Sequence, residues 1–223
     1  MTHQDRLWHS WCDGKPTHPA TLDDYAALGR GALALFEATG DPDYLAQAQH
    51  WVHIADRHYG DANAGGYFFA ADDTPGLITR TKSAHDNAVP SGNGMMAHVC
   101  ARLYFLTGDD AYYRKTESII TAFSGALTTN FFPLSTLVNA AEFLQSALQI
   151  VIVSPRADAA ALSHAVYGLS LPNRLVSIID PDVALPITHP AHGKGQLNGA
   201  PTAYICRGPV CSSPVTTPDA LTQ

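Results

Sequence analysis

The segment AHDNAVPSGN, residues 84–93, carries the side chains best suited to chemistry in this sequence of 223 residues. General acid and base catalysis needs two groups that exchange protons with a substrate lying between them, as paired carboxylates do in sugar hydrolysis. The carboxylate of Asp86 and the imidazole of His85 fit this description, and we predict both as catalytic residues. The alternative is that residues 85–87 only hold a loop together, because buried polar side chains need partners of their own.

The side chains around this pair are suited to holding a substrate. Basic groups attract anions or lower the pKa of a nearby carboxylate, and amides suit hydroxyl groups because they both donate and accept hydrogen bonds. The predicted substrate-binding residues in this segment are Arg80, Lys82, Asn87, Ser91 and Asn93. Structural alternatives stay open here. Ser91 can be a plain helix cap after the extended Val89-Pro90 pair, and Asp72-Asp73 can be ordinary turn residues.

The segment HPATLDDYAAL, residues 18–28, is a second candidate. We predict Asp24 as the third catalytic residue, after Asp86 and His85. Tyr25 and Trp11 are predicted to bind substrate, with the indole offering a surface on which a sugar ring can stack. The alternative is that Asp23 and Asp24 only stabilise a helix N-terminus, where negative charge is favourable.

The composition excludes several classes of function. Hydrophobic residues make up 46% of the chain and charged residues 15%, which favours a folded domain with a core. The formal net charge of −7 argues against a surface for nucleic acid or for an anionic membrane, both of which need a basic face. No apolar stretch reads as a membrane span or as the core of a signal peptide. We therefore expect a cytoplasmic protein.

The four cysteines are expected to be reduced in that compartment. Cys206 and Cys211 are separated by four residues, and a zinc site there would need further ligands such as His189 and His192. A simple thiol pair is the preferred interpretation. Because no second cysteine pair and no phosphate-binding glycine loop accompany these residues, we predict neither a metal nor a cofactor.

Apolar spacing and cap residues predict the elements that position these candidates. Five helices are expected to begin at residues 21, 41, 91 and 109 and after Pro133, with two short strands at 65–69 and 76–79. Later in the chain, strands are expected at 150–154, 173–180 and 202–207, with a helix at 157–169. We therefore predict a helical part, residues 1–149, followed by a small α/β module, residues 150–223.

An internal repeat links two of the helical hairpins. LALFEATGDPDY at 33–44 aligns with RLYFLTGDDAY at 102–112, each with a Thr-Gly-Asp turn between helices. Repeated hairpins that cannot bury their own apolar faces stack on one another in solenoids or toroids.

Several longer segments resemble a known family. SWCDGKPTHPATLDDYAAL (10–28), GGYFFAADDTPGLITRTKSAHDNAVPSGN (65–93), LPNRLVSIID (171–180) and PTAYICRGPVCSSPVTTPDAL (201–221) are similar, in order, to pieces of the YyaL/spermatogenesis-associated thioredoxin-domain-containing protein family. The resemblance is to the C-terminal part of that family and does not include its thioredoxin-like domain. It implies an (α/α)6 toroid like those of six-hairpin glycosidases and N-acylglucosamine 2-epimerases.

This resemblance, together with the number of predicted helices, leads to the expected fold and function. Five helices cannot close a twelve-helix ring, so the predicted fold is mainly α, a partial (α/α)6 toroid with a small C-terminal α/β appendage. A second chain or copy would complete the ring unless the chain is a fragment. The expected function is that of a carbohydrate-active enzyme, glycosidase- or sugar-epimerase-like, with a small carbohydrate ligand at residues 80–93. The alternative is a non-catalytic scaffold or interaction fragment of a thioredoxin-domain-containing protein.

Overall fold

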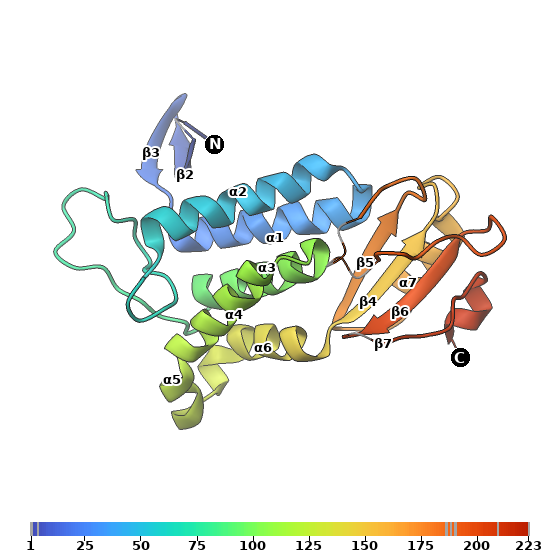
Figure 1. Ribbon diagram of the computed structural model, residues 1–223. Coiled ribbons are helices and arrows are strands. Elements are labelled where there is room, and N and C mark those ends of the chain that lie inside the picture. Colours follow the sequence, from blue (N-terminus) through green and yellow to red (C-terminus); the bar gives the residue numbers. More distant parts are fainter. Residues whose placement is uncertain are drawn as a thin grey trace.

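The protein consists of a layer of helical hairpins joined to an α/β module (Figure 1). This is a computed structural model that describes residues 2–3, 5–185, 187, 189, 191–208 and 210–222. The helices are α1 (Leu22–Thr39), α2 (Pro42–Tyr59), α3 (Gly92–Thr107), α4 (Asp110–Ala122), α5 (Ser124–Thr129), α6 (Ser135–Ser146) and α7 (Ala160–Gly168), with 3-10 turns η1 (Phe132–Leu134) and η2 (Pro218–Thr222). The strands are β1 (Thr2–His3), β2 (Arg6–Cys12), β3 (Lys15–Pro19), β4 (Leu148–Val153), β5 (Arg174–Ile179), β6 (Thr202–Arg207) and β7 (Val210–Cys211).

The prediction of a mainly α, partial toroid is wrong, because the described chain is mixed α/β. It is 46% helical and 17% strand, with two separate sheets. One sheet has the order β1-β2-β3 and the other β5-β4-β6-β7. The sequence does not predict the first sheet, because β3 buries no residue and β2 buries only Leu7, so neither strand alternates buried apolar with exposed polar side chains.

The Thr-Gly-Asp repeat forms the same turn twice, as predicted. Gly40 and Gly108 both end a helix with a left-handed backbone, at φ 73° and 71°. In each copy the threonine hydroxyl, of Thr39 or Thr107, donates back to the carbonyl four residues earlier. The following aspartate caps the next helix by accepting a backbone N–H two residues later. Side chains near in sequence build the whole turn, which is why the sequence predicts it well.

Helix α3 lies at the centre of the helical layer. It packs against α1, α4 and α6, while α2 packs mainly on α1. Buried aromatic side chains on neighbouring elements fill the space around it, including Tyr25, Tyr59 and Phe143. The layer ends at Ser146, and β4 begins at Leu148.

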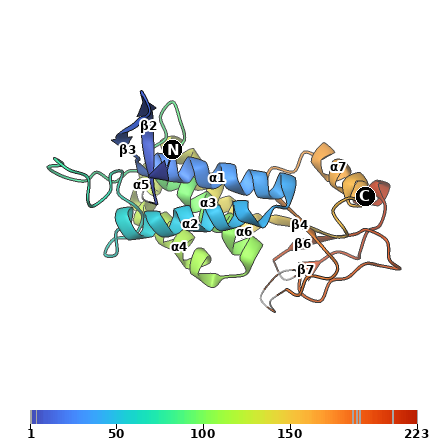
Figure 2. The same cartoon turned by 90° about the horizontal axis from the view of Figure 1, so that it is seen from above.

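The C-terminal module is built on β4, all of whose side chains are buried. Strand β5 pairs parallel to it after α7, so the predicted strand–helix–strand unit is confirmed. Strand β6 pairs antiparallel on the other side of β4. Viewed from above, the module lies at one end of the helical layer and the long loop of residues 60–91 at the other (Figure 2).

Two local predictions are wrong. Residues 65–69 and 76–79 are not strands, and within the described chain residues 60–91 contribute only a single bridge between Gly60 and Tyr67. Gly65, Gly66 and Gly76 take left-handed backbone conformations that interrupt strand geometry.

The second error concerns the cysteines. Cys206 and Cys211 form a disulfide, whereas a reduced thiol pair was expected. The two residues face each other across the β6–β7 pairing, with their Cα atoms 3.9 Å apart, so the hairpin itself brings the sulfurs together. The described helices include none that is long and apolar enough to span a bilayer.

Candidate functional site

The carboxylate of Asp86 ties two helix starts together. One oxygen accepts the Ser91 backbone N–H at 2.8 Å, beside the start of α3. The other accepts the Thr136 backbone N–H at 2.8 Å and the Ser135 hydroxyl at 2.9 Å, both at the start of α6. Burial by itself would raise the pKa of Asp86, but these donors outweigh it and lower the pKa. Asp86 is therefore ionised at neutral pH and engaged with groups of the protein.

The neighbours of Asp86 have separate roles. His85 and Asn87 are both exposed, and no hydrogen bond joins the His85 and Asp86 side chains in the described chain. Ser91 caps α3 by accepting the Gly94 N–H, which fits the structural interpretation of that residue. Whether any of these side chains contacts a substrate stays a prediction.

The side chain of Asn93 forms hydrogen bonds with the backbone of the loop at residues 60–91, as a neighbouring strand would. Its side-chain oxygen accepts the Tyr67 N–H at 2.8 Å, and its side-chain nitrogen donates to the carbonyl of Tyr67 at 2.8 Å and to that of Ser83 at 2.9 Å. Asn93 is almost completely buried. It thus satisfies backbone groups that would otherwise be paired across a sheet.

The two predicted basic residues are engaged inside the same loop. Lys82 donates to the Asp61 carboxylate at 2.7 Å and to the Gly65 carbonyl at 2.8 Å. The guanidinium of Arg80 lies 4.1 Å from the centre of the Phe68 ring and donates to the carbonyl of His58. The Lys82 ammonium is the main reason that the pKa of Asp61 is lowered to about 2.

The second candidate segment surrounds the start of α1. Asp24 accepts the backbone N–H and the hydroxyl of Thr21 and contacts His9 Nδ1 at 2.9 Å. Tyr25 is fully buried and its hydroxyl accepts the Leu7 N–H, whereas Trp11 is exposed on β2. The residues predicted to line one site with Asp24 therefore point into the core, to solvent and to the helix end.

Asp23, which the sequence suggests only as a charge at a helix end, also contacts the start of α3. Burial raises its pKa, and the Gly92 backbone N–H opposes that rise. Asp23 and Asp86 thus bind consecutive amides, those of Gly92 and Ser91, at the start of α3. Two carboxylates fasten the starts of α1, α3 and α6 to one another. The adjacent aspartates of the helix start were the only signal in the sequence.

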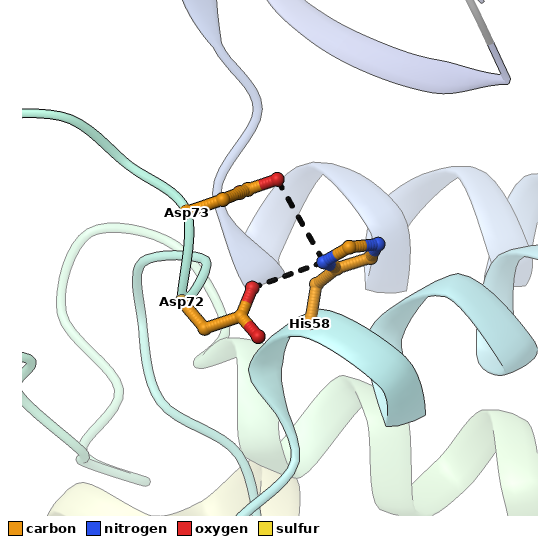
Figure 3. A group of neighbouring side chains, drawn as sticks. All are labelled: His58, Asp72 and Asp73. Carbon is orange, nitrogen blue, oxygen red and sulfur yellow. Dashed lines mark hydrogen bonds and ion pairs between the residues drawn. The ribbon is translucent and has the colours of Figure 1, made fainter.

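A third cluster contains His58, Asp72 and Asp73 (Figure 3). His58 Nδ1 lies 3.0 Å from an Asp72 oxygen and 3.8 Å from an Asp73 oxygen. Three such donor atoms within 4.8 Å of one another suit a metal ion by spacing alone. Asp73, however, is held by both terminal nitrogens of Arg6, at 2.8 and 3.1 Å, and this hydrogen bonding lowers its pKa. The cluster joins β2, α2 and the loop.

Comparisons with known proteins find relatives over most of the chain. The human spermatogenesis-associated protein 20 (Homo sapiens) is 33% identical over 210 residues, which are 90% of this chain and 26% of that protein. The rat protein of the same name (Rattus norvegicus) is 31% identical over 207 residues, with the same shares of each chain. An uncharacterized protein from Caenorhabditis elegans is 25% identical over 199 residues, covering 88% of this chain and 27% of its own. No protein-family model matches the chain.

These matches support the resemblance to the spermatogenesis-associated family. The chain spans about a quarter of the length of the curated relatives it matches. None of their names states a reaction, so the function rests on the geometry of the chain itself.

Proposed function

We propose that this chain is a non-catalytic scaffold, the alternative that the sequence left open. The observation that carries the proposal is that the Asp86 carboxylate is engaged in hydrogen bonds within the protein. Ionised carboxylates only accept hydrogen bonds, and that of Asp86 already accepts three from the starts of two helices. Asp24 and Asn93, the other central candidates, are likewise engaged with groups of the protein.

A carbohydrate-active enzyme would need a different arrangement. Glycosidases place two carboxyl groups about 5–10 Å apart with open space for the sugar and a water between them. Asp86 and Asp23 instead accept hydrogen bonds from the neighbouring amides of Ser91 and Gly92 at the start of α3. This geometry favours a role in fixing the helices over a role in proton transfer.

The experiment that tests the proposal replaces Asp86 by asparagine. The amide keeps the shape but loses the charge and one acceptor, so we expect the free energy of unfolding in urea to fall by about 1–2 kcal/mol. Asp158→Asn, at an exposed position before α7, is the control and should change it little. The wild-type chain should show no saturable binding in calorimetry with a panel of mono- and disaccharides.

Two results would contradict the scaffold. One is saturable binding of a sugar that Asp86→Asn abolishes while the circular dichroism spectrum is unchanged. The other is turnover of a sugar substrate that the same substitution removes. In either case the enzyme hypothesis at residues 80–93 would replace the scaffold.

A scaffold also needs a surface for its partner, and α1 offers one. Leu28 and Leu35 are 47% and 45% exposed, with Gly31 exposed between them. We name these three residues the α1 edge. A narrow apolar edge with a glycine at its centre lets a second helix approach closely, and we propose a second copy of the chain as its partner.

A further inference from the structure

A cavity of about 700 Å³ is lined by residues of the helical layer and of the α/β module, and by none of residues 60–91. Its walls come from α1, α3, α7 and the segment that leads into β5. The side chains that matter here are Arg30, His98, Arg102, Tyr167, Leu171 and Arg174. A volume of this size suits a small organic molecule.

Positive charge gathers in this cavity although the chain as a whole is acidic. Three guanidinium groups face one carboxylate, that of Glu37, whereas the formal net charge of the chain is −7. Glu37 forms an ion pair with Arg102, and its second oxygen accepts the Val176 backbone N–H at 3.3 Å. Among the described residues that line the cavity, Glu37 is thus the one acidic group, it is paired with Arg102, and Arg30 and Arg174 have no carboxylate to neutralise them.

The two remaining arginines differ in how they are held. Arg174 lies 5.0 Å from the centre of the Tyr167 ring and donates to the Leu169 carbonyl at 3.1 Å, which leaves its other donors available. Arg30 is exposed and has no acidic partner within 4 Å among the residues that the structure describes. Guanidinium groups without a carboxylate partner are suited to bind carboxylate or phosphate through paired hydrogen bonds.

His98 adds a further polar group to the same wall. Its Nδ1 atom is buried and has no hydrogen-bond partner in the described part of the chain. Burial, reinforced by the nearby charge of Arg30, lowers its pKa to about 4, so the ring is neutral at pH 7. Buried polar atoms without a partner are uncommon in native proteins, and a bound ligand would supply one.

We propose that this cavity binds a small organic anion. Arg30 and Arg174 would hold its carboxylate or phosphate group, and its apolar part would pack on Tyr167 and Leu171. The site is separate from residues 80–93, so it stands whether or not the scaffold proposal holds.

The proposal can be tested by titrating the ¹⁵N-labelled chain and following its amide resonances. The probes are phenyl phosphate, phenylacetate and the neutral phenylacetamide. We expect at least one anion to shift resonances near residues 98–102 and 167–174 saturably, and phenylacetamide to bind about tenfold more weakly or not at all. The two anions also distinguish a phosphate ligand from a carboxylate ligand. Equal binding of the neutral amide, or no saturable shift with either anion, would overturn the proposal.

Variants locate the binding. Arg30→Gln and Arg174→Gln should each weaken binding of the preferred anion about tenfold, because each removes a charged hydrogen-bond donor. Arg57→Gln, an exposed arginine on α2, is the matched control and should leave the affinity unchanged. Arg30 is exposed, so its variant should keep the wild-type pattern of resonances. Equal loss in all three variants would indicate general attraction to basic groups and would refute the assigned site.

Discussion

Single polar side chains in this protein act mainly on the backbone of other elements. Asp86 binds amides at the starts of α3 and α6, and Asn93 binds both backbone groups of Tyr67. The sequence predicts that the 84–93 segment is unusual, because it concentrates polar types before a helix. It does not predict their partners, since Thr136 lies 50 residues from Asp86 in the chain. Short-range patterns carry no information about such contacts.

His98 should make the stability of the chain depend on pH. Its pKa falls from 6.5 to about 4 on folding, so between these values the unfolded chain binds a proton that the folded chain does not. The stabilisation is present above pH 6.5 and is lost as the pH falls toward 4. From pH 6.5 to 5, we expect the free energy of unfolding to fall by about 1 kcal/mol per pH unit because of this one group.

The measurement compares urea unfolding of the wild type and of His98→Gln at pH 6.5 and 5. Because the other histidines are common to both proteins, the difference between the two pH slopes isolates His98. The charged groups that share its cavity are Arg30, Arg102, Arg174 and Glu37. Since Arg30 contributes to the low pKa, Arg30→Gln should reduce the slope in part. Parallel slopes in wild type and His98→Gln would show that the histidine takes up its proton equally well in both states.

Among helices and strands, those specified by nearby residues were predicted best. The starts of α1, α2, α3 and α4 follow from their cap residues, and the two Thr-Gly-Asp turns are built within a few residues. The segments 65–69 and 76–79 look like strands by composition, but glycines in left-handed conformations break them. Strands β2 and β3 were missed because so few of their side chains are buried. The two strands are neighbours in the chain, with Cys12 paired to Lys15, so a missing apolar pattern and not a distant partner hid them.

The β6–β7 hairpin carries a disulfide whose contribution can be measured. Cys206 and Cys211 close a short loop, for which chain entropy predicts about 2 kcal/mol of stabilisation. Adding a reductant should therefore lower the free energy of unfolding of the wild type by up to about this amount. Cys211→Ser cannot form the bond and should not respond to the reductant. A count of four free thiols in the unfolded, unreduced wild type would refute the disulfide directly.

The molecule as a whole combines a layer of helices with an α/β module. Neither the family resemblance nor the helical repeat predicted this proportion of helix to strand. Most helices and the three long strands of the C-terminal module were predicted, but the N-terminal sheet was not, because its strands bury almost no side chains. The pairing of β6 with β4 was not predicted either, because 48 residues separate the end of β4 from the start of β6. The cavity with its three arginines was not predicted for the same reason. Arg30, Arg102 and Arg174 lie on three separate elements, so no local sequence motif predicts the cavity.

The α1 edge leads to a prediction about assembly. A second copy that packs its own α1 edge against the first would bury Leu28 and Leu35 on both chains in a two-fold contact, which is the commonest symmetry of soluble oligomers. Sedimentation velocity should then show a dimer whose population rises with concentration. Replacing both leucines by glutamate should shift it to the monomer, because a charge buried at the contact would lack a partner.

Leu77→Glu supplies the control, since Leu77 is equally exposed, at 46%, but lies in the loop at residues 60–91. Its variant should dimerise as the wild type does. A wild type that stays monomeric at the highest soluble concentration would exclude a second copy as the partner of this edge. A dimer that persists in the double variant would assign the contact to another surface and leave the α1 edge without a role in self-association.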